Sequence, residues 1–224
     1  MWKYNREKND RSPDVTEIVT QVWCSEGSVA KRFRKLETPN TSIQILAITN
    51  TNNFVIMTLF LGDLKREDLS GKTVLVRVDY NVPLKKDDTS NTMQLADTSR
   101  MRASLPSLEF LLRNGAKVVL CSHLDRPRGP DPTLSLRLLV EPLLEMVKEF
   151  SASVIFVDEC IGAKVDKAKQ ELRAGEILLL ENLRFHSDEM SNDSTFSEQL
   201  ASHIDIYVND AFGAAHRGID IFCS

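Results

Sequence analysis

The sequence predicts an α/β protein with a three-layer, Rossmann-like fold, in which helices cover both faces of a mostly parallel sheet. After Gly62, short apolar runs rich in β-branched residues alternate with longer segments that have helical spacing. The apolar runs are continuous, which is typical of strands buried on both faces. Strands and helices in strict alternation indicate right-handed β-α-β units and a parallel sheet.

Each element follows from its own local pattern. The strands are the apolar runs, and the helices are the segments with apolar residues three and four apart. Pro106 should bend the first helix, and Gly115 should end it. A short helix is also a possibility within residues 21–36. The predicted strands cover 72–78, 116–122, 153–157, 175–181 and 204–210, and the predicted helices cover 99–113, 135–150, 162–172 and 194–203.

Composition narrows the class of protein. The chain has 224 residues, a formal net charge of −4 and 42% hydrophobic residues, as expected for an ordinary globular protein. The net charge gives no reason to expect binding to nucleic acid. No apolar run reaches the roughly 18 residues of a membrane span, so we expect no membrane partner. The four cysteines are far apart, which argues against zinc ribbons and favours a reducing compartment.

The chain divides near Met57. Residues 1–56 are rich in Asn and Thr and show only fragments of periodicity, so we expect a poorly ordered extension. Residues 57–224 are expected to form the folded domain. The protein is predicted to be cytoplasmic, although organelle targeting by residues 1–56 stays open as an alternative.

Polar and cationic residues follow four of the five predicted strands. Because parallel strands present their carboxyl ends at one edge, these residues should gather there. Arginine binds phosphate and carboxylate bidentately and keeps its charge, which makes an anion site the natural interpretation. Taken singly, such a residue is more often a solvated surface group; the convergence favours function. The residues are Asp79, Asn81, His123, Arg126, Arg128, Glu181, Asn182, Arg184, His186, Asp210, His216 and Arg217, with Arg100 and Arg102 opening the first helix.

Two nucleotide motifs are absent in their full form. SGKT at 70–73 resembles the end of a P-loop, but Arg66 stands where that motif needs glycine, and the strand follows instead of preceding it. No G-x-G-x-x-G follows any predicted strand. Neither motif therefore predicts a nucleotide-binding site in this chain.

Four segments resemble the N-terminal domain of phosphoglycerate kinases in order and separation, over about Asp63 to Gly218. They are RVDYNVPL, SHLDRP, LLLENLRFH and YVNDAFGAAHR. The resemblance implies a cytoplasmic kinase of glycolysis, a transferase that moves a phosphoryl group between ATP and 3-phosphoglycerate to give 1,3-bisphosphoglycerate. It also implies ATP or ADP and Mg²⁺ as cofactors, with either phosphoglycerate as the partner of this domain, and we expect a monomer.

The resemblance also implies roles for particular residues. Asp79 and Asn81 would contact the hydroxyl and carboxylate of the substrate. Arg100 would be catalytic, stabilising the transferring group while also binding substrate. The phosphate would meet the basic residues His123, Arg126, Arg184 and Arg217, supported by His216 and Asp210.

The chain departs from the family pattern in two ways that matter for function. Asp125 stands where the family usually has glycine. Its carboxylate either opposes the anion or points outward into solvent, and the family's glycine would serve its backbone freedom, which aspartate tolerates better than most residues. We expect Asp125→Gly to tighten phosphoglycerate binding. The family's nucleotide domain, which holds the nucleotide and the metal ion, has no counterpart after Arg217. We therefore expect no cofactor-binding residues and no metal ligands in this chain, and we expect it to bind substrate without turning it over. The alternatives are a non-catalytic regulatory fragment and an interaction domain that binds no phosphoglycerate.

Overall fold

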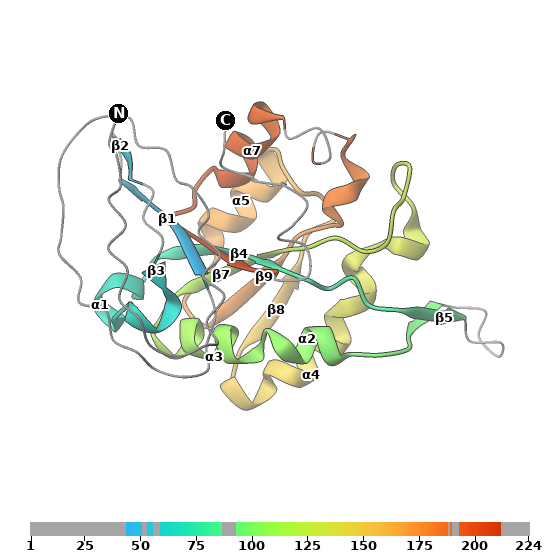
Figure 1. Ribbon diagram of the computed structural model, residues 1–224, viewed down its shortest axis with the longest axis horizontal. Coiled ribbons are helices and arrows are strands. Elements are labelled where there is room, and N and C mark those ends of the chain that lie inside the picture. The colour runs from blue at the N-terminus through green and yellow to red at the C-terminus, as the bar shows by residue number, and fades with distance from the viewer. Residues whose placement is uncertain are drawn as a thin grey trace, which may run out of the picture.

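The molecule is built around one large sheet (Figure 1). The computed structural model describes residues 44–50, 53–55, 59–86, 93–187, 189 and 193–211. The sheet has eight strands, seven of them in the order β2-β1-β10-β4-β7-β9-β8, with β3 paired to β1. The strands are β1 (Gln44–Asn50), β2 (Asn53–Val55), β3 (Leu59–Phe60), β4 (Thr73–Val78), β7 (Lys117–Cys121), β8 (Ser153–Phe156), β9 (Glu176–Leu179) and β10 (Ile206–Asp210).

Strand direction confirms the predicted α/β class. Strands β10, β4, β7, β9 and β8 run parallel to one another. The antiparallel pairs in the described part of this sheet join β1 to β10, to β2 and to β3. The carboxyl ends of the five parallel strands therefore lie at one edge, as the β-α-β pattern requires.

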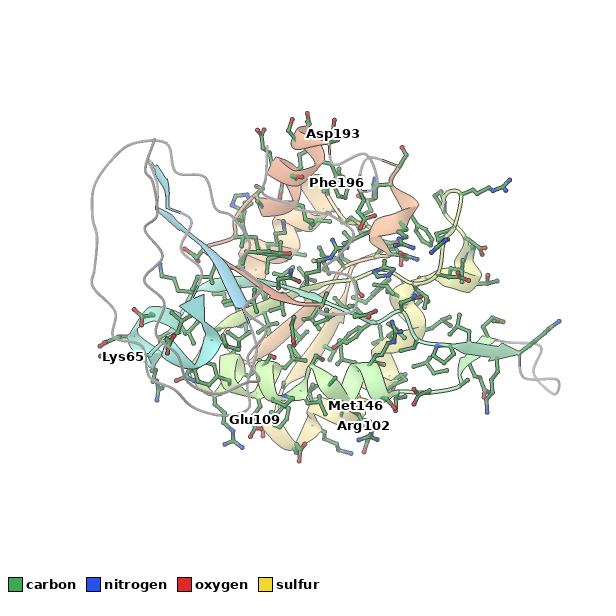
Figure 2. All side chains as sticks on the ribbon, viewed as in Figure 1. Lys65, Arg102, Glu109, Met146, Asp193 and Phe196 are labelled. Atoms are coloured by element: carbon green, nitrogen blue, oxygen red, sulfur yellow. The ribbon has the colours of Figure 1, made fainter. Side chains whose placement is uncertain are left out.

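Alternating side chains of the central strands feed two separate cores. In β4, Val74, Val76 and Val78 join the core beneath α3 and α4, while Leu75 joins the core beneath α5 and α7. Side chains fill the spaces on both sides of the sheet (Figure 2), which confirms the three layers. The helices are α1 (Arg66–Leu69), α2 (Ser99–Ala103), α3 (Leu105–Arg113), α4 (Val140–Val147), α5 (Ala163–Glu171) and α7 (Ser194–Ala201).

Prolines lie close to the start of an α-helix in two of the predicted helical segments. The segment 99–113 breaks at Ser104 into α2 and α3, just before Pro106. The segment 135–150 begins as a 3-10 turn and becomes α-helical at Val140, which places Pro142 in the first turn, where no N–H is needed. Gly115 follows α3 with a φ of 80°, the left-handed conformation that ends a helix.

Several strands were not predicted from the sequence. A hairpin of β5 (Leu84–Lys86) and β6 (Met93–Leu95) precedes α2, and strands this short show no periodicity. Strands β1 and β2 lie within residues 1–56, and β1 pairs along the outer edge of β10. The division of the chain at residue 57 stays a prediction, and the helix considered for 21–36 lies outside the described residues. Within the described residues, no helix is long and apolar enough to cross a membrane.

Candidate anion site at the carboxyl edge of the sheet

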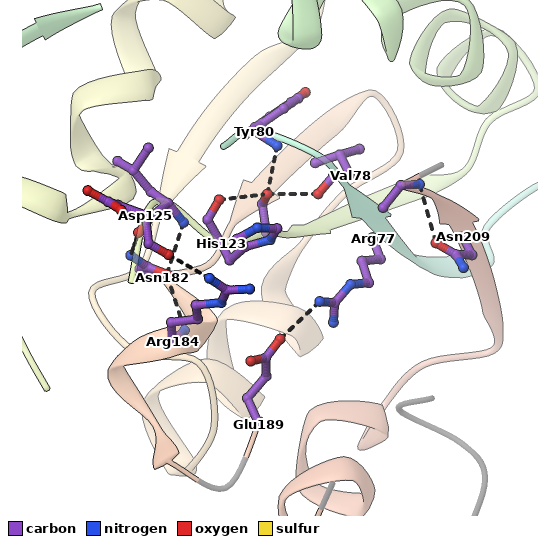
Figure 3. Close-up of polar contacts among 12 residues, drawn as sticks. Arg77, Val78, Tyr80, His123, Asp125, Asn182, Arg184, Glu189 and Asn209 are labelled. Atoms are coloured by element: carbon purple, nitrogen blue, oxygen red, sulfur yellow. Dashed lines mark hydrogen bonds and ion pairs between the residues drawn. The ribbon is translucent and has the colours of Figure 1, made fainter. Parts of the chain in front are cut away.

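The loops that follow β4, β7 and β9 meet at the carboxyl edge of the sheet, because these strands are neighbours (Figure 3). The loop after β4 carries Asp79 and Asn81, the loop after β7 carries His123 and Asp125, and a 3-10 turn after β9 carries Arg184. These residues are far apart in sequence and adjacent in the fold. The structure thus brings together most of the predicted site residues that it describes.

Asp79 and Arg100 form an ion pair across the site. Nη1 of Arg100 donates to both carboxylate oxygens of Asp79 at 2.8 Å. Arg100 is half-exposed on the short helix α2, whereas Asp79 is mostly covered. The backbone N–H of Asn81 also donates to Asp79, at 3.2 Å. The carboxylate of Asp79 is therefore held from two sides, with the Arg100 guanidinium at the solvent side.

The backbone of Asp125 joins two other predicted residues. Its N–H donates to Oδ1 of Asn81 at 2.8 Å, and its carbonyl oxygen accepts from Nη1 of Arg184 at 2.8 Å. Its φ is 54°, in the left-handed region that glycine, asparagine and aspartate adopt most readily. The need for backbone freedom at this position is thereby confirmed, and the Asp125 side chain is exposed.

His123 lies beneath these residues and is uncharged at neutral pH. Its side chain is buried, and burial lowers its pKa to about 4, with the positive charges of Arg184 and Arg77 acting in the same direction. A neutral imidazole still donates one hydrogen bond to an anion. An incoming negative charge would raise the pKa of His123 again, because it offsets the neighbouring guanidinium groups.

Buried polar side chains hold the loops in place. Oγ of Ser122 accepts from the N–H of Tyr80 at 2.9 Å and donates to the carbonyl of Val78 at 2.7 Å. Asn182 is fully buried and donates from Nδ2 to the carbonyls of Leu124 and Leu134. Its side-chain oxygen accepts from the N–H of Leu124 and of Arg184. Asn182 thus fixes the backbone on both sides of the site.

A buried ion pair beneath the site escaped the sequence analysis. Arg77 in β4 and Glu189 are 3% and 1% exposed, and Nη2 of Arg77 donates to Oε1 of Glu189 at 2.9 Å. Nη1 of Arg77 and Oε2 of Glu189 have no hydrogen-bond partner. The signal was present in the sequence, since an arginine interrupts the apolar run of a central strand. The pair ties the segment after Arg184 to the middle of the sheet.

Asp210 ends β10 next to β4, where its Cα is the register partner of Val78. Oγ of Ser107 donates to its Oδ2 at 2.7 Å, which links β10 to α3. Burial raises the pKa of Asp210 to about 6. These contacts suit a supporting position rather than direct contact with an anion.

The other predicted residues take no part in these contacts or lie outside the described residues. Arg126 is exposed on the loop after β7, and His186 packs against Phe196 with ring centroids 5.1 Å apart. His186 also lines a separate hollow of about 590 Å³ at the carboxyl ends of β8 and β9, which none of the predicted substrate residues lines. His216 and Arg217 lie outside the described residues.

Among the described residues, no group of three or more His, Cys, Asp or Glu side chains is arranged to hold a metal ion. The site gathers hydrogen-bond donors and guanidinium groups, which suit an anion. Mg²⁺ therefore has no fitting ligand set among these residues.

Comparison with known proteins places the chain. The family model described as phosphoglycerate kinase matches residues 64–219. The chain is 49% identical over 158 residues to "Phosphoglycerate kinase, chloroplastic" of Volvox carteri, covering 70% of this chain and 33% of that protein. It is 48% identical over 157 residues to "Phosphoglycerate kinase 3, cytosolic" of Arabidopsis thaliana, covering 70% and 37%.

The fold agrees with a solved structure. Phosphoglycerate kinase from Pyrococcus horikoshii OT3 superposes with a TM-score of 0.59 at 31% identity, over 70% of this chain and 37% of that one. The chain thus spans well under half the length of the relatives it matches. With a family match over residues 64–219 and a shared fold, this chain belongs to the phosphoglycerate kinase family.

Proposed function

We propose that this chain binds 3-phosphoglycerate or 1,3-bisphosphoglycerate at the carboxyl edge of its sheet. One observation carries the proposal: the backbone of residue 125 joins Asn81 and Arg184, which come from different loops, at 2.8 Å each. This arrangement sets an amide and a guanidinium side by side on a buried, hydrogen-bonded support. A ligand with phosphate, carboxylate and hydroxyl groups matches these donors best.

Each residue has a proposed part in binding. Arg184 and His123 face the phosphate, with Arg126 and Arg217 completing the basic surface. Asp79 and Asn81 hold the hydroxyl and carboxylate. Arg100 approaches the carboxylate that receives the phosphoryl group, and its guanidinium offsets the negative charge that builds up there. His216 and Asp210 support these groups.

The reaction belongs to the complete kinase, of which this chain spans the substrate-binding part. A carboxylate oxygen of 3-phosphoglycerate attacks the γ-phosphorus of ATP, the bond to the β-phosphate oxygen breaks, and ADP leaves with 1,3-bisphosphoglycerate formed. The described residues contribute positioning and charge neutralisation, which supply most of the catalysis in phosphoryl transfer. We expect the isolated chain to bind substrate without turnover.

Calorimetric titration with 3-phosphoglycerate tests the proposal. Arg184→Lys keeps the charge but loses the planar guanidinium that donates to Asp125, so it should weaken binding by about tenfold or more. Arg113→Lys is the matched control, because Arg113 is exposed at the end of α3 and pairs with Glu109. Absence of binding by the unchanged protein would refute the function, and equal weakening by both variants would refute the site.

The same experiments bear on the alternatives. A regulatory fragment without catalysis would also bind 3-phosphoglycerate, whereas an inherited interaction domain would not. We further propose a monomer in the cytoplasm. The cytosolic relative from Arabidopsis thaliana supports that compartment, while the chloroplastic relative from Volvox carteri keeps organelle import as the alternative.

A further inference from the structure

We propose that Asp125 is a specificity-determining residue, a fixed negative charge beside the anion site that lowers affinity in proportion to the charge of the ligand. This inference rests on the proposed phosphoglycerate site. Asp125 is the residue whose backbone connects Asn81 to Arg184, and its side chain is exposed (Figure 3). The carboxylate of Asp125 is therefore at the site, but it takes no part in the backbone hydrogen bonds that connect the loops.

Covalent geometry limits how far the carboxylate lies from the ligand-binding groups. The carbonyl oxygen of Asp125 is 2.8 Å from Nη1 of Arg184. Adding the backbone and side-chain bonds of one residue places the carboxylate oxygens within about 9 Å of that nitrogen in every rotamer. This distance is no greater than the Debye length of about 10 Å at 0.1 M salt. The charge of Asp125 is thus felt by any anion that Arg184 binds.

The backbone conformation explains how a charge comes to be fixed at this position. With a φ of 54°, residue 125 favours glycine, asparagine or aspartate, and aspartate alone among these carries charge. Neither backbone contact uses the carboxylate, since the N–H and the carbonyl oxygen make them. Asparagine has the same shape and tolerates the same backbone, so Asp125→Asn removes the charge while leaving the support intact.

The expected consequence is a penalty that grows with ligand charge. The positive charges of Arg184 and Arg100 attract an anion, and the negative charge of Asp125 offsets part of that attraction. Coulomb's law at about 8 Å gives an effect of about twofold per unit charge in a water-like medium and more than tenfold at the lower dielectric of a protein surface. Asp125 would therefore weaken the binding of highly charged phosphoglycerate more than the binding of glycerate, which carries only the carboxylate. Weaker binding would also speed release of the charged ligand.

The test is titration of the unchanged chain, Asp125→Asn and Asp125→Gly with 3-phosphoglycerate and with D-glycerate at pH 7.5. We expect both variants to bind 3-phosphoglycerate about threefold or more tighter, with a smaller gain for glycerate. The gain should shrink between 20 mM and 500 mM salt as screening increases (about 20 to 4 Å in Debye length). The matched control is Asp131→Asn, which removes a carboxylate from the same long loop at a residue that lines the separate hollow.

Each outcome has a definite meaning. Equal affinities of the three proteins would overturn the role of Asp125 and leave the phosphoglycerate site standing. A gain independent of salt and ligand charge would also overturn it, because relief of steric crowding has that signature. Binding by none of the proteins would overturn the inference together with the proposed function.

Discussion

In this structure a single nitrogen of Arg100 contacts both carboxylate oxygens of Asp79, each at 2.8 Å. The two residues come from different elements, the end of β4 and the short helix α2. A ligand carboxylate that binds Arg100 must therefore share the guanidinium with Asp79 or displace it. The pairing holds the proposed catalytic arginine at the site before substrate arrives, which lowers the entropic cost of placing it.

Replacing Arg100 by alanine should weaken 3-phosphoglycerate binding by about tenfold to a hundredfold, since a charge-assisted hydrogen bond contributes about 1.5–3 kcal/mol. Calorimetry measures the effect. The control is Arg102→Ala on the same helix, whose side chain is exposed and points away from the sheet (Figure 2). If Arg102→Ala weakens binding as much as Arg100→Ala does, helix α2 contributes only general positive charge.

Breaking the buried Arg77–Glu189 pair should be strongly destabilising. Glu189→Gln leaves the guanidinium of Arg77 buried without a counter-charge, and we expect a loss of about 3–5 kcal/mol in the free energy of unfolding. Urea unfolding measures it. Glu145→Gln removes a partner of the exposed pair with Lys148 and should cost less than about 1 kcal/mol. Similar losses in the two variants would show that the Arg77–Glu189 pair is not effectively buried in solution.

Replacing Asp125 by alanine separates backbone strain from charge. Alanine has neither the freedom of glycine nor the local hydrogen bonding of asparagine at a φ of 54°, so we expect a loss of about 1–2 kcal/mol in the free energy of unfolding. Asp125→Asn should be nearly neutral in the same urea experiment. A neutral Asp125→Ala would indicate that this loop relaxes to negative φ without cost.

His123 should make the fold sensitive to acid. Its pKa is about 4 in the folded protein, mainly because it is buried, against about 6.5 when unfolded. Below pH 6.5 the unfolded chain binds a proton that the folded chain does not, so this stability is lost as pH falls through 6.5 toward 4. The upper bound of the loss is about 3 kcal/mol.

The measurement is the difference in unfolding free energy between the unchanged chain and His123→Asn, followed from pH 7.5 to 4. Comparing the two proteins removes the contribution of Asp210, which both of them share. That contribution has the opposite sign over much of the same pH range, because the raised pKa of Asp210, about 6, increases stability as pH falls. If this difference in unfolding free energy does not change with pH, the pKa of His123 is the same in the folded and unfolded protein. Added 3-phosphoglycerate should raise the pKa of His123 in the folded protein, because the anion favours the imidazolium.

The elements that were predictable from sequence are those with long, regular patterns. All five parallel strands were found within one or two residues, because continuous apolar runs between helices have few other solutions. The short strands β2, β3, β5 and β6 were not predicted, because two or three residues show no period. The seven-residue strand β1 was also missed, and it pairs with the distant strand β10. The segment 135–150 was predicted as one helix, whereas its α-helical part begins at Val140. The missed signal was Pro142, which is best tolerated in the first turn of a helix.

The candidate site was predictable in kind but not in detail. Parallel strands bring their carboxyl ends together, so residues after β4, β7 and β9 had to converge whatever the loops did. His186 follows the same rule in sequence yet turns toward Phe196, because aromatic packing against α7 holds it there. Arg77 was hidden in an apolar run, and its partner Glu189 lies 112 residues away.

By itself, the sequence determined the fold class, the family likeness and the set of cationic loops, because these depend on local periodicity and on short motifs. Tertiary structure alone decided which of those side chains face one another. It showed Asp79 held by Arg100, Asn81 and Arg184 joined through the backbone of Asp125, and His123 buried as a neutral group. The physical reason is that hydrogen bonds and desolvation act between residues that only the folded sheet brings into contact.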